Sequence, residues 1–419
     1  MTVREYIRFN WKNSIRKGEY KNLPYPYNSP SCEQTSDVGF ENFFYWDTYF
    51  INLGLLIDGM KEQALNNIRN MIFLIDKYGY MPNVATEGGD NRSQFPLFIP
   101  MCHAYWQYTQ DKEFVREAYP AMKKEYAFWM SRRTLPCGLN RYGNNADAKT
   151  CSDFYKIITD TRLDGEAGKT ESEMESLGSN LLSEAESGWD FTPRFNARAE
   201  HYAPIDLNSL LYENEKILAF FGKLSGEENS YGEAAERRAG LLSRYAEKDG
   251  IFYDYDADRN ACSPVISSAL LMPYLCGLSD DKEKAMEILN RLRTNYGIPA
   301  TEKSDEYGKY QWSYPNIWPP LVCLSVMAAD RVGLKDEAKL LARQYVEMVD
   351  RGWIDTGSLW EKYDCISGRK AFVHEYNESK MLGWTAGTYR VFENYLSTGR
   401  MIHNFNIPKT EEEGKDEVN

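Results

Sequence analysis

Residues 62–78, EQALNNIRNMIFLIDKY, carry the pattern that decides the fold. Ile68, Ile72 and Ile75 recur at helical spacing, so they fall near one face of a helix. Gly79 follows directly, and glycine is typical of the position just after a helix end. The stretch therefore predicts an amphipathic α-helix with its apolar face on a core.

The same periodicity recurs along the chain. It predicts helices over residues 113–133, 206–224, 231–247, 282–296, 335–349 and 382–396. Pro319 and Pro320 precede LVCLSVMAADRVG, which predicts a helix with prolines in its first turn. Alternating strand patterns are nearly absent, with one short candidate at 250–255. Helical pairs recur at roughly 30 to 40 residues without the self-similarity of a short solenoid repeat. We expect an all-α toroid of paired helices with its loops gathered at one mouth.

Composition excludes several classes of protein. The chain has 419 residues, a net charge of -13 and no basic cluster, so neither nucleic acid nor an anionic membrane surface is expected as a partner. Aromatic residues make up 14%, including 30 Tyr and 10 Trp. This excess indicates either an aromatic-lined cavity or the ordinary packing of a large helical protein.

Cysteine usage and the first residues bear on localisation. None of the eight cysteines forms a CxxC pair or shows zinc-ligand spacing with the four histidines. The first twenty residues are charged throughout, unlike a signal peptide, and no run of 18 apolar residues occurs. We expect reduced thiols, no metal and a cytoplasmic protein.

Domain organisation follows from the absence of a Pro/Gly/Ser-rich linker. We predict one domain over residues 1–405 and a disordered acidic tail over residues 406–419. The polar segment 164–186 is either a solvated loop or a mobile lid over a site.

Four stretches interrupt the helical pattern with aromatics, carboxylates and glycines. They are GFENFFYWDTYF (39–50), ESGWDFTPRF (186–195), QWSYPNIWPPL (311–321) and LWEKYD (359–364), the last followed by Glu375 and Gly383-Trp384. Sugar rings have apolar faces that stack on aromatics and hydroxyl rims that need carboxylates, amides and arginine. Glycosidic cleavage needs one protonated carboxyl and a second carboxylate. Together these stretches indicate sugar hydrolysis without a cofactor.

In this order the stretches resemble the trehalase family of inverting glycosidases, built on an (α/α)6 barrel. YWDTYF resembles the first family signature, QWSYPNIWPPL the second, and ESGWDF and LWEKYD the loops that hold the acid and the base. GYMPN (79–83), RSQFP (92–96) and PIDLNSLLYENE (204–215) also follow the family order. The resemblance spans about residues 38 to 396.

The resemblance implies a role for each matching residue. Asp190 becomes the general acid and Glu361 the general base, with Glu375 the rival for the base. Without the motif, Asp190 would be a helix cap and Glu361 with Lys362 a surface ion pair. Asp190 must be protonated and therefore partly buried, whereas Glu361 is expected in a hydrated position. The implied sugar-binding residues are Phe40, Tyr45, Trp46, Asp47, Asn83, Arg92, Gln94, Arg162, Gly188, Trp189, Gln311, Trp312, Glu375 and Trp384.

The sequence also departs from the family. Val38-Gly39-Phe40 stands where trehalases have GGRF, the RPRPE stretch is not clearly present, and Arg162 lies in its place. Ser313 and Ile317 replace the Asp and Gly of QWDxPNG. Four functions stay open. They are a trehalase-like α-glucosidase, a hydrolase of α-glucosyl- or α-mannosyl-glycerate or another α-glucoside, a non-catalytic carbohydrate-binding barrel, and a helical interaction scaffold. Each fits a monomer or a small homo-oligomer.

Overall fold

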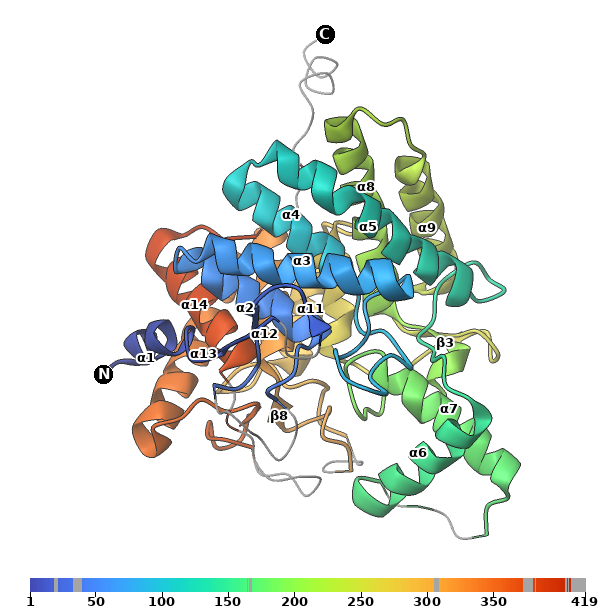
Figure 1. Ribbon diagram of the computed structural model, residues 1–419. Helices are drawn as coiled ribbons and strands as arrows, with labels where there is room; N and C mark the ends of the chain where they lie inside the picture. The colour runs from blue at the N-terminus through green and yellow to red at the C-terminus, as the bar shows by residue number, and fades with distance from the viewer. Residues whose placement is uncertain are drawn as a thin grey trace.

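The computed structural model describes residues 1–18, 22–32, 40–163, 165, 168–304, 309–371, 380, 382–403, 405 and 407. Helices dominate it (Figure 1). They are α1 (Val3–Asn10), α2 (Tyr45–Ile57), α3 (Lys61–Tyr78), α4 (Phe98–Thr109), α5 (Lys112–Arg132), α6 (Ala148–Thr161), α7 (Glu171–Ala185), α8 (Ile205–Ser225), α9 (Tyr231–Tyr245), α10 (Met272–Cys276), α11 (Lys282–Leu292), α12 (Pro319–Arg331), α13 (Lys335–Thr356) and α14 (Gly383–Thr398), with 3-10 turns at Ala199–His201 and Ser268–Leu271.

The strands are two residues each and pair locally. They are β1 (Ile15–Arg16), β2 (Tyr27–Asn28), β3 (Tyr202–Ala203), β4 (Glu247–Lys248), β5 (Ile251–Phe252), β6 (Tyr255–Asp256), β7 (Ala261–Cys262), β8 (Asn316–Ile317) and β9 (Tyr363–Asp364). Every pairing is antiparallel, in the orders β1-β2, β3-β6-β7, β4-β5 and β8-β9. The β8-β9 pair matters for the site, because it joins two of the motif stretches.

The helices form a closed ring of pairs. Among the described residues, α2, α4, α8, α10, α12 and α14 each contact the next helix of this set, and α14 returns to α2. These inner helices are buried on nearly all sides, whereas α3, α5, α9, α11 and α13 bury one face and cover the outside. Helix α1 packs on the outside through Tyr6, whose ring lies 4.4 Å from that of Trp353 on α13. The result is the predicted (α/α)6 barrel.

Ring closure depends on a close approach between α2 and α14. A Cβ atom on Gly387 would lie 2.1 Å from the carbonyl oxygen of Phe50, and one on Gly54 would lie 3.1 Å from the Cα of Gly387. Only glycines allow two helix backbones to come this near. The first and last inner helices therefore meet through small residues.

Every segment predicted to be helical forms a helix, although α11 ends at Leu292 and α13 runs on to Thr356. Helices α1, α2, α4, α6, α7 and α10 were not predicted from the sequence. Helices α2 and α4 are buried on nearly all sides and have no polar face to reveal their period. The short strand pattern at 250–255 was right, since β5 and part of β6 lie there.

The polar segment 164–186, predicted as a solvated loop or a mobile lid, is mostly helical. Residues Glu171–Ala185 form α7, which begins with a capping box between Thr170 and Glu173. With α6 it makes a hairpin that projects from the barrel at the lower right of Figure 1. A small apolar cluster, apart from the main core, joins Tyr155 of α6 and Leu181 of α7 to Phe191 and Tyr310.

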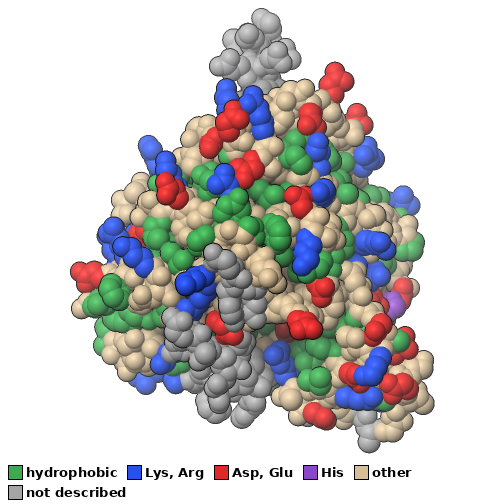
Figure 2. Space-filling model, in the orientation of Figure 1, with side chains coloured by type: hydrophobic (Ala, Val, Ile, Leu, Met, Phe, Trp, Pro, Cys, Tyr) green, Lys and Arg blue, Asp and Glu red, His purple; other side chains and the backbone are tan. Residues whose placement is uncertain are grey.

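Several other findings bear on the expectations. All eight cysteines are free thiols. No helix in the described part of the chain is both long and apolar enough to cross a bilayer. On the face shown in Figure 2, basic and acidic side chains are interspersed rather than gathered by sign. The predicted tail, 406–419, lies outside the described residues except for Ile407.

Candidate active site

The four motif stretches meet at one cavity of about 400 Å³. It is lined by Phe40, Phe44, Trp46, Asp47, Asn83, Arg92, Gln94, Arg162, Gly188, Asp190, Gln311, Trp312, Trp318, Glu361 and Trp384. The volume suits a small, polar ligand of sugar size. Residues scattered over most of the sequence thus come together as the motif order predicted.

Backbone hydrogen bonds join the first stretch to the segment that follows α3. The amide of Tyr45 donates to the carbonyl of Asn83 (3.1 Å), and the amide of Asn83 donates to the carbonyl of Arg92 (3.0 Å). The amide of Trp46 donates to the Oε1 atom of Gln94 (3.0 Å). These bonds place Asn83, Arg92 and Gln94 beside the start of α2.

Tryptophans build the apolar wall. The rings of Trp312 and Trp318 stack with centroids 3.6 Å apart and planes 4° apart, and Trp318 was not predicted. Trp46 lies 5.6 Å from Trp312 and 5.8 Å from Trp384, the latter edge to face. Because Trp318 covers one face of Trp312, only the rest of that ring is left to meet a sugar.

Asp190 faces the cavity from the turn after α7. Its backbone carbonyl accepts a hydrogen bond from Gln311 Nε2 (2.6 Å), and Arg162 Nη1 lies 3.7 Å from its Oδ2 atom. The side chain is 32% exposed. Burial raises the pKa of the carboxyl above its ordinary 3.8; Arg162 and Arg92 oppose the rise, and Glu361 adds to it. The net effect of these surroundings is a raised pKa, the direction expected for a general acid.

Gly188 allows the turn that carries Asp190 to pack closely against Trp46. Its φ is +82°, in the left-handed region, and a Cβ atom there would lie 3.0 Å from the indole of Trp46. A side chain would be strained and would press on the apolar wall. The glycine therefore lets the loop that carries Asp190 pack directly on Trp46.

Glu361 differs from the expected hydrated carboxylate, because it is only 4% exposed. Lys362 Nζ lies 2.7 Å from its Oε2 atom, so the predicted ion pair forms, but it is buried rather than at the surface. The same ammonium lies 4.7 Å from the ring centroid of Trp318. Trp384 Nε1 donates to the backbone carbonyl of Glu361 (2.9 Å). The charge of Glu361 is balanced within the wall of the cavity.

Asp47 is a third carboxyl on the cavity. It lies in the first turn of α2 and is 3% exposed. Burial, with a smaller contribution from Glu361, raises its pKa to about 8. At neutral pH Asp47 is therefore mostly a neutral acid, which donates as well as accepts hydrogen bonds.

Two of the described residues that were predicted, Tyr45 and Trp189, do not line the cavity. Tyr45 points away from it, toward the carboxylate of Glu125, and accepts a hydrogen bond from the amide of Phe98 (3.1 Å). Trp189 lies behind Trp312, with centroids 5.9 Å apart. Glu375 lies outside the described residues. Phe44 and Trp318 were missed, although both stand inside the quoted motifs.

Arg194 lies in the same motif as Asp190, but its contacts stabilise the fold and its side chain does not line the cavity. Its guanidinium is fully buried and pairs with Asp206 (2.7 Å) and Asp254 (2.8 Å). The described residues hold no group of three or more His, Cys, Asp or Glu side chains suited to a metal ion.

An aromatic-walled cavity lined by three carboxyls in an (α/α)6 barrel is the arrangement of a glycoside hydrolase. The Trehalase family profile matches residues 5–397, so the chain belongs to the trehalase family. It is 30% identical to the trehalase of Apis mellifera over 385 residues, which is 83% of this chain and 60% of that protein. It is also 30% identical to the periplasmic trehalase of Pseudomonas aeruginosa over 400 residues, 87% of this chain and 70% of that one. The chain thus spans only about 60 to 70% of these relatives.

Solved structures share the fold. The neutral trehalase of Saccharomyces cerevisiae superposes with a TM-score of 0.72 at 22% identity, covering 99% of this chain and 85% of that one. The mannosylglycerate hydrolase of Thermus thermophilus, in complex with Tris and D-glycerate, superposes with a TM-score of 0.65 at 15% identity, covering 94% of this chain and 100% of that one.

Proposed function

We propose that this protein is an inverting α-glycosidase that hydrolyses a small α-linked glucoside such as trehalose. The observation that carries the proposal is the pair of carboxyls, Asp190 and Glu361, on one tryptophan-walled cavity. Burial favours the protonated form of Asp190, and Lys362 balances the charge of Glu361. One carboxyl is thus favoured as a proton donor and the other has a basic side chain beside it, as an acid and a base require.

The proposed reaction is a single displacement. Asp190 gives its proton to the glycosidic oxygen as the bond to the anomeric carbon breaks. A water molecule attacks that carbon from the opposite face and gives its proton to Glu361. For this the carboxyls must flank the bond at roughly 6.5–9.5 Å, which leaves room for the water. Two sugars leave, Glu361 releases its proton to solvent, and solvent returns a proton to Asp190.

The remaining lining residues have supporting roles. Asp47, Asn83 and Gln94 present polar groups for the hydroxyls of the cleaved ring, while Trp46 and Trp384 meet its apolar faces. Arg92 and Arg162 lie on the side of Asp190, where the leaving group departs.

Sugar release tests the reaction, with trehalose, other α-linked disaccharides and glycosyl-glycerates as substrates. Asp190→Asn and Glu361→Gln should each lower kcat by about 10²–10⁴-fold or more, because each removes a proton-transfer group. NMR of freshly released sugar should show the β-anomer of the cleaved ring, and with trehalose an equal amount of α-glucose from the leaving ring. Initial sugar without any β-anomer would contradict inversion, and an active Glu361→Gln variant beside an inactive Glu375→Gln variant would assign the base to Glu375.

A second substrate class is favoured by the two arginines. Arg92 and Arg162 both face Asp190, and guanidinium groups match carboxylates. A glycosyl-glycerate would bring such a carboxylate to the leaving-group side. Preference for glycerate conjugates over disaccharides in the same panel would select this alternative.

We also propose that residues 1–405 form one catalytic domain and that the protein works in the cytoplasm. Free thiols at all eight cysteines support a reducing compartment. Limited proteolysis, cell fractionation and light scattering would test the domain, the compartment, and whether the protein is a monomer or a small homo-oligomer.

A further inference from the structure

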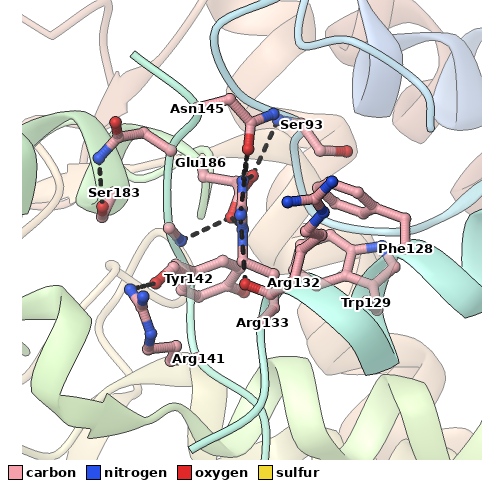
Figure 3. A network of polar contacts seen from close by, with 12 residues as sticks. Ser93, Phe128, Trp129, Arg132, Arg133, Arg141, Tyr142, Asn145, Ser183 and Glu186 are labelled. Carbon is pink, nitrogen blue, oxygen red and sulfur yellow. Dashed lines mark hydrogen bonds and ion pairs between the residues drawn. The ribbon is translucent and has the colours of Figure 1, made fainter. Parts of the chain in front are cut away.

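A buried ion pair lies directly behind the cavity, between Arg133 at the end of α5 and Glu186 at the end of α7 (Figure 3). Their side chains are 3% and 0% exposed. Two parallel bonds join them, Nε to Oε2 and Nη2 to Oε1, each 2.8 Å. This bidentate geometry is the strongest form of an arginine–carboxylate contact.

Glu186 accepts two further hydrogen bonds, both from backbone amides. Ser93 donates to Oε1 (2.9 Å) and Gly143 donates to Oε2 (2.6 Å). Each carboxylate oxygen therefore accepts two bonds, which fills the acceptor capacity of an ionised carboxylate. A side chain that carries N–H or O–H donors cannot replace Glu186 without losing some of these four hydrogen bonds.

These four bonds fix backbone on two sides of the cavity. Ser93 stands between Arg92 and Gln94, which both line the cavity. Glu186 itself begins the turn that presents Gly188 and Asp190. One carboxylate thus holds together the segment with two sugar-facing side chains and the segment with the proposed acid.

We propose that Glu186, held by Arg133, is a positioning residue for the reaction. It sets the placement of Asp190 relative to Arg92 without touching the substrate. This inference rests on the proposed function. Arg92 lowers the pKa of Asp190, and Glu186 in turn supports the charge of Arg92. Loosening the 92–94 segment should therefore also change the pH at which Asp190 loses its proton.

The test is the double variant Arg133→Met with Glu186→Met, beside the single Glu186→Gln. The double variant removes both charges, so no unpaired buried charge remains and the fold is kept. In Glu186→Gln, the side-chain NH2 group faces some of the N–H groups that donate to Glu186 in the wild type, so those hydrogen bonds are lost. Activity is expressed per folded protein, with the folded fraction taken from thermal melts.

A matched control exists in the same barrel. Arg238 on α9 and Glu215 on α8 form a buried pair with a contact of 2.8 Å and exposures of 5% and 2%. Neither side chain lines the cavity. Replacing both with Met costs stability but should leave kcat/KM of the folded protein unchanged.

We expect the Arg133/Glu186 double variant to lose about 10²-fold in kcat/KM, as misplacement of a catalytic group by about 1 Å does. The basic limb of its pH profile should move to higher pH, because Arg92 no longer holds down the pKa of Asp190. Hydrogen exchange should quicken in peptides covering 91–96 and 187–191, which is a measurement independent of turnover. The proposal would be overturned if the double variant kept the wild-type kcat/KM, the wild-type basic limb of the pH profile and the wild-type rates of hydrogen exchange. A wild-type protein that releases no sugar would refute the proposed function, and exchange would still decide the positioning role.

Discussion

Replacing Arg162 with Met tests the electrostatic account of the proposed acid. Arg162 is the charge that most opposes the rise in the pKa of Asp190. Without it, that pKa should rise further, and Asp190 should stay protonated to a higher pH. The basic limb of the kcat/KM profile, where the acid is lost, should therefore move upward.

The size of the shift follows from the contact. At 3.7 Å two unit charges interact by about 1 kcal/mol in a water-like dielectric and about 4 to 5 kcal/mol at an effective dielectric of 20. The side chains are 28% and 32% exposed, so solvent screens them and the lower figure applies. Because one pH unit corresponds to 1.36 kcal/mol, we expect a shift of about 0.7 unit. The shift should shrink in about 1 M salt, where the Debye length falls to about 3 Å.

The assay is sugar release at low substrate concentration across pH, for the wild type, Arg162→Met and Arg162→Lys. The lysine variant keeps the charge and should shift less. Arg141→Met is a matched control, because Arg141 and Glu200 are 3.5 Å apart with exposures of 28% and 25% and lie away from the cavity. The reasoning would be refuted if the basic limb of the Arg162→Met profile stayed in place or moved to lower pH, or if Arg141→Met moved it equally.

Two further predictions concern stability. Asp47 has a pKa of about 8 when folded and an ordinary value of 3.8, so the folded state binds an extra proton between these values. Stability should fall as pH rises through that window, by at most about 1.4 kcal/mol per unit, and level off above it. Asp47→Asn should remove the Asp47 share of the slope in urea titrations at pH 5 to 8, while the buried Glu125, Glu184 and Glu213, whose pKa values are also raised, contribute equally in both proteins. Identical slopes in the two proteins would contradict the buried neutral acid. Gly387→Ala should destabilise by about 1–3 kcal/mol, because its Cβ would meet the carbonyl of Phe50. Gly232→Ala, with open space around it on α9, should be neutral or stabilising, and equal melting temperatures for both variants would argue against the close approach.

Much of the arrangement could be predicted from the sequence, because the relevant signals are local. Amphipathic periods locate outer helices such as α3, and glycine at position 79 ends that helix. Each motif is an unbroken run of sequence, so it can be recognised locally, and the closed fold brings residues of all four motifs to the same cavity. Inner helices such as α2 lack a polar face, and their burial was visible only in the structure.

What could not be predicted depends on contacts between distant segments. The capping box at Thr170 was a readable signal for α7, but nothing local shows that Phe191 would pack with Tyr155 and Tyr310 in one apolar cluster. The stacking of Trp318 on Trp312 likewise required the turn geometry of 311–318.

The two buried carboxylates show why residue type alone is an incomplete guide to chemistry. Glu361 stands inside LWEKYD and Glu186 begins ESGWDFTPRF, and each is paired with a basic residue. Glu361 lines the cavity beside Lys362, whereas Glu186 does not line it, and its two oxygens accept four hydrogen bonds from Arg133, Ser93 and Gly143. A carboxylate on the cavity can reach a water molecule bound there, and one whose acceptors are all occupied away from the cavity can only hold its neighbours in place. Access to the cavity, which only the folded structure reveals, therefore separates a proposed base from a proposed positioning residue.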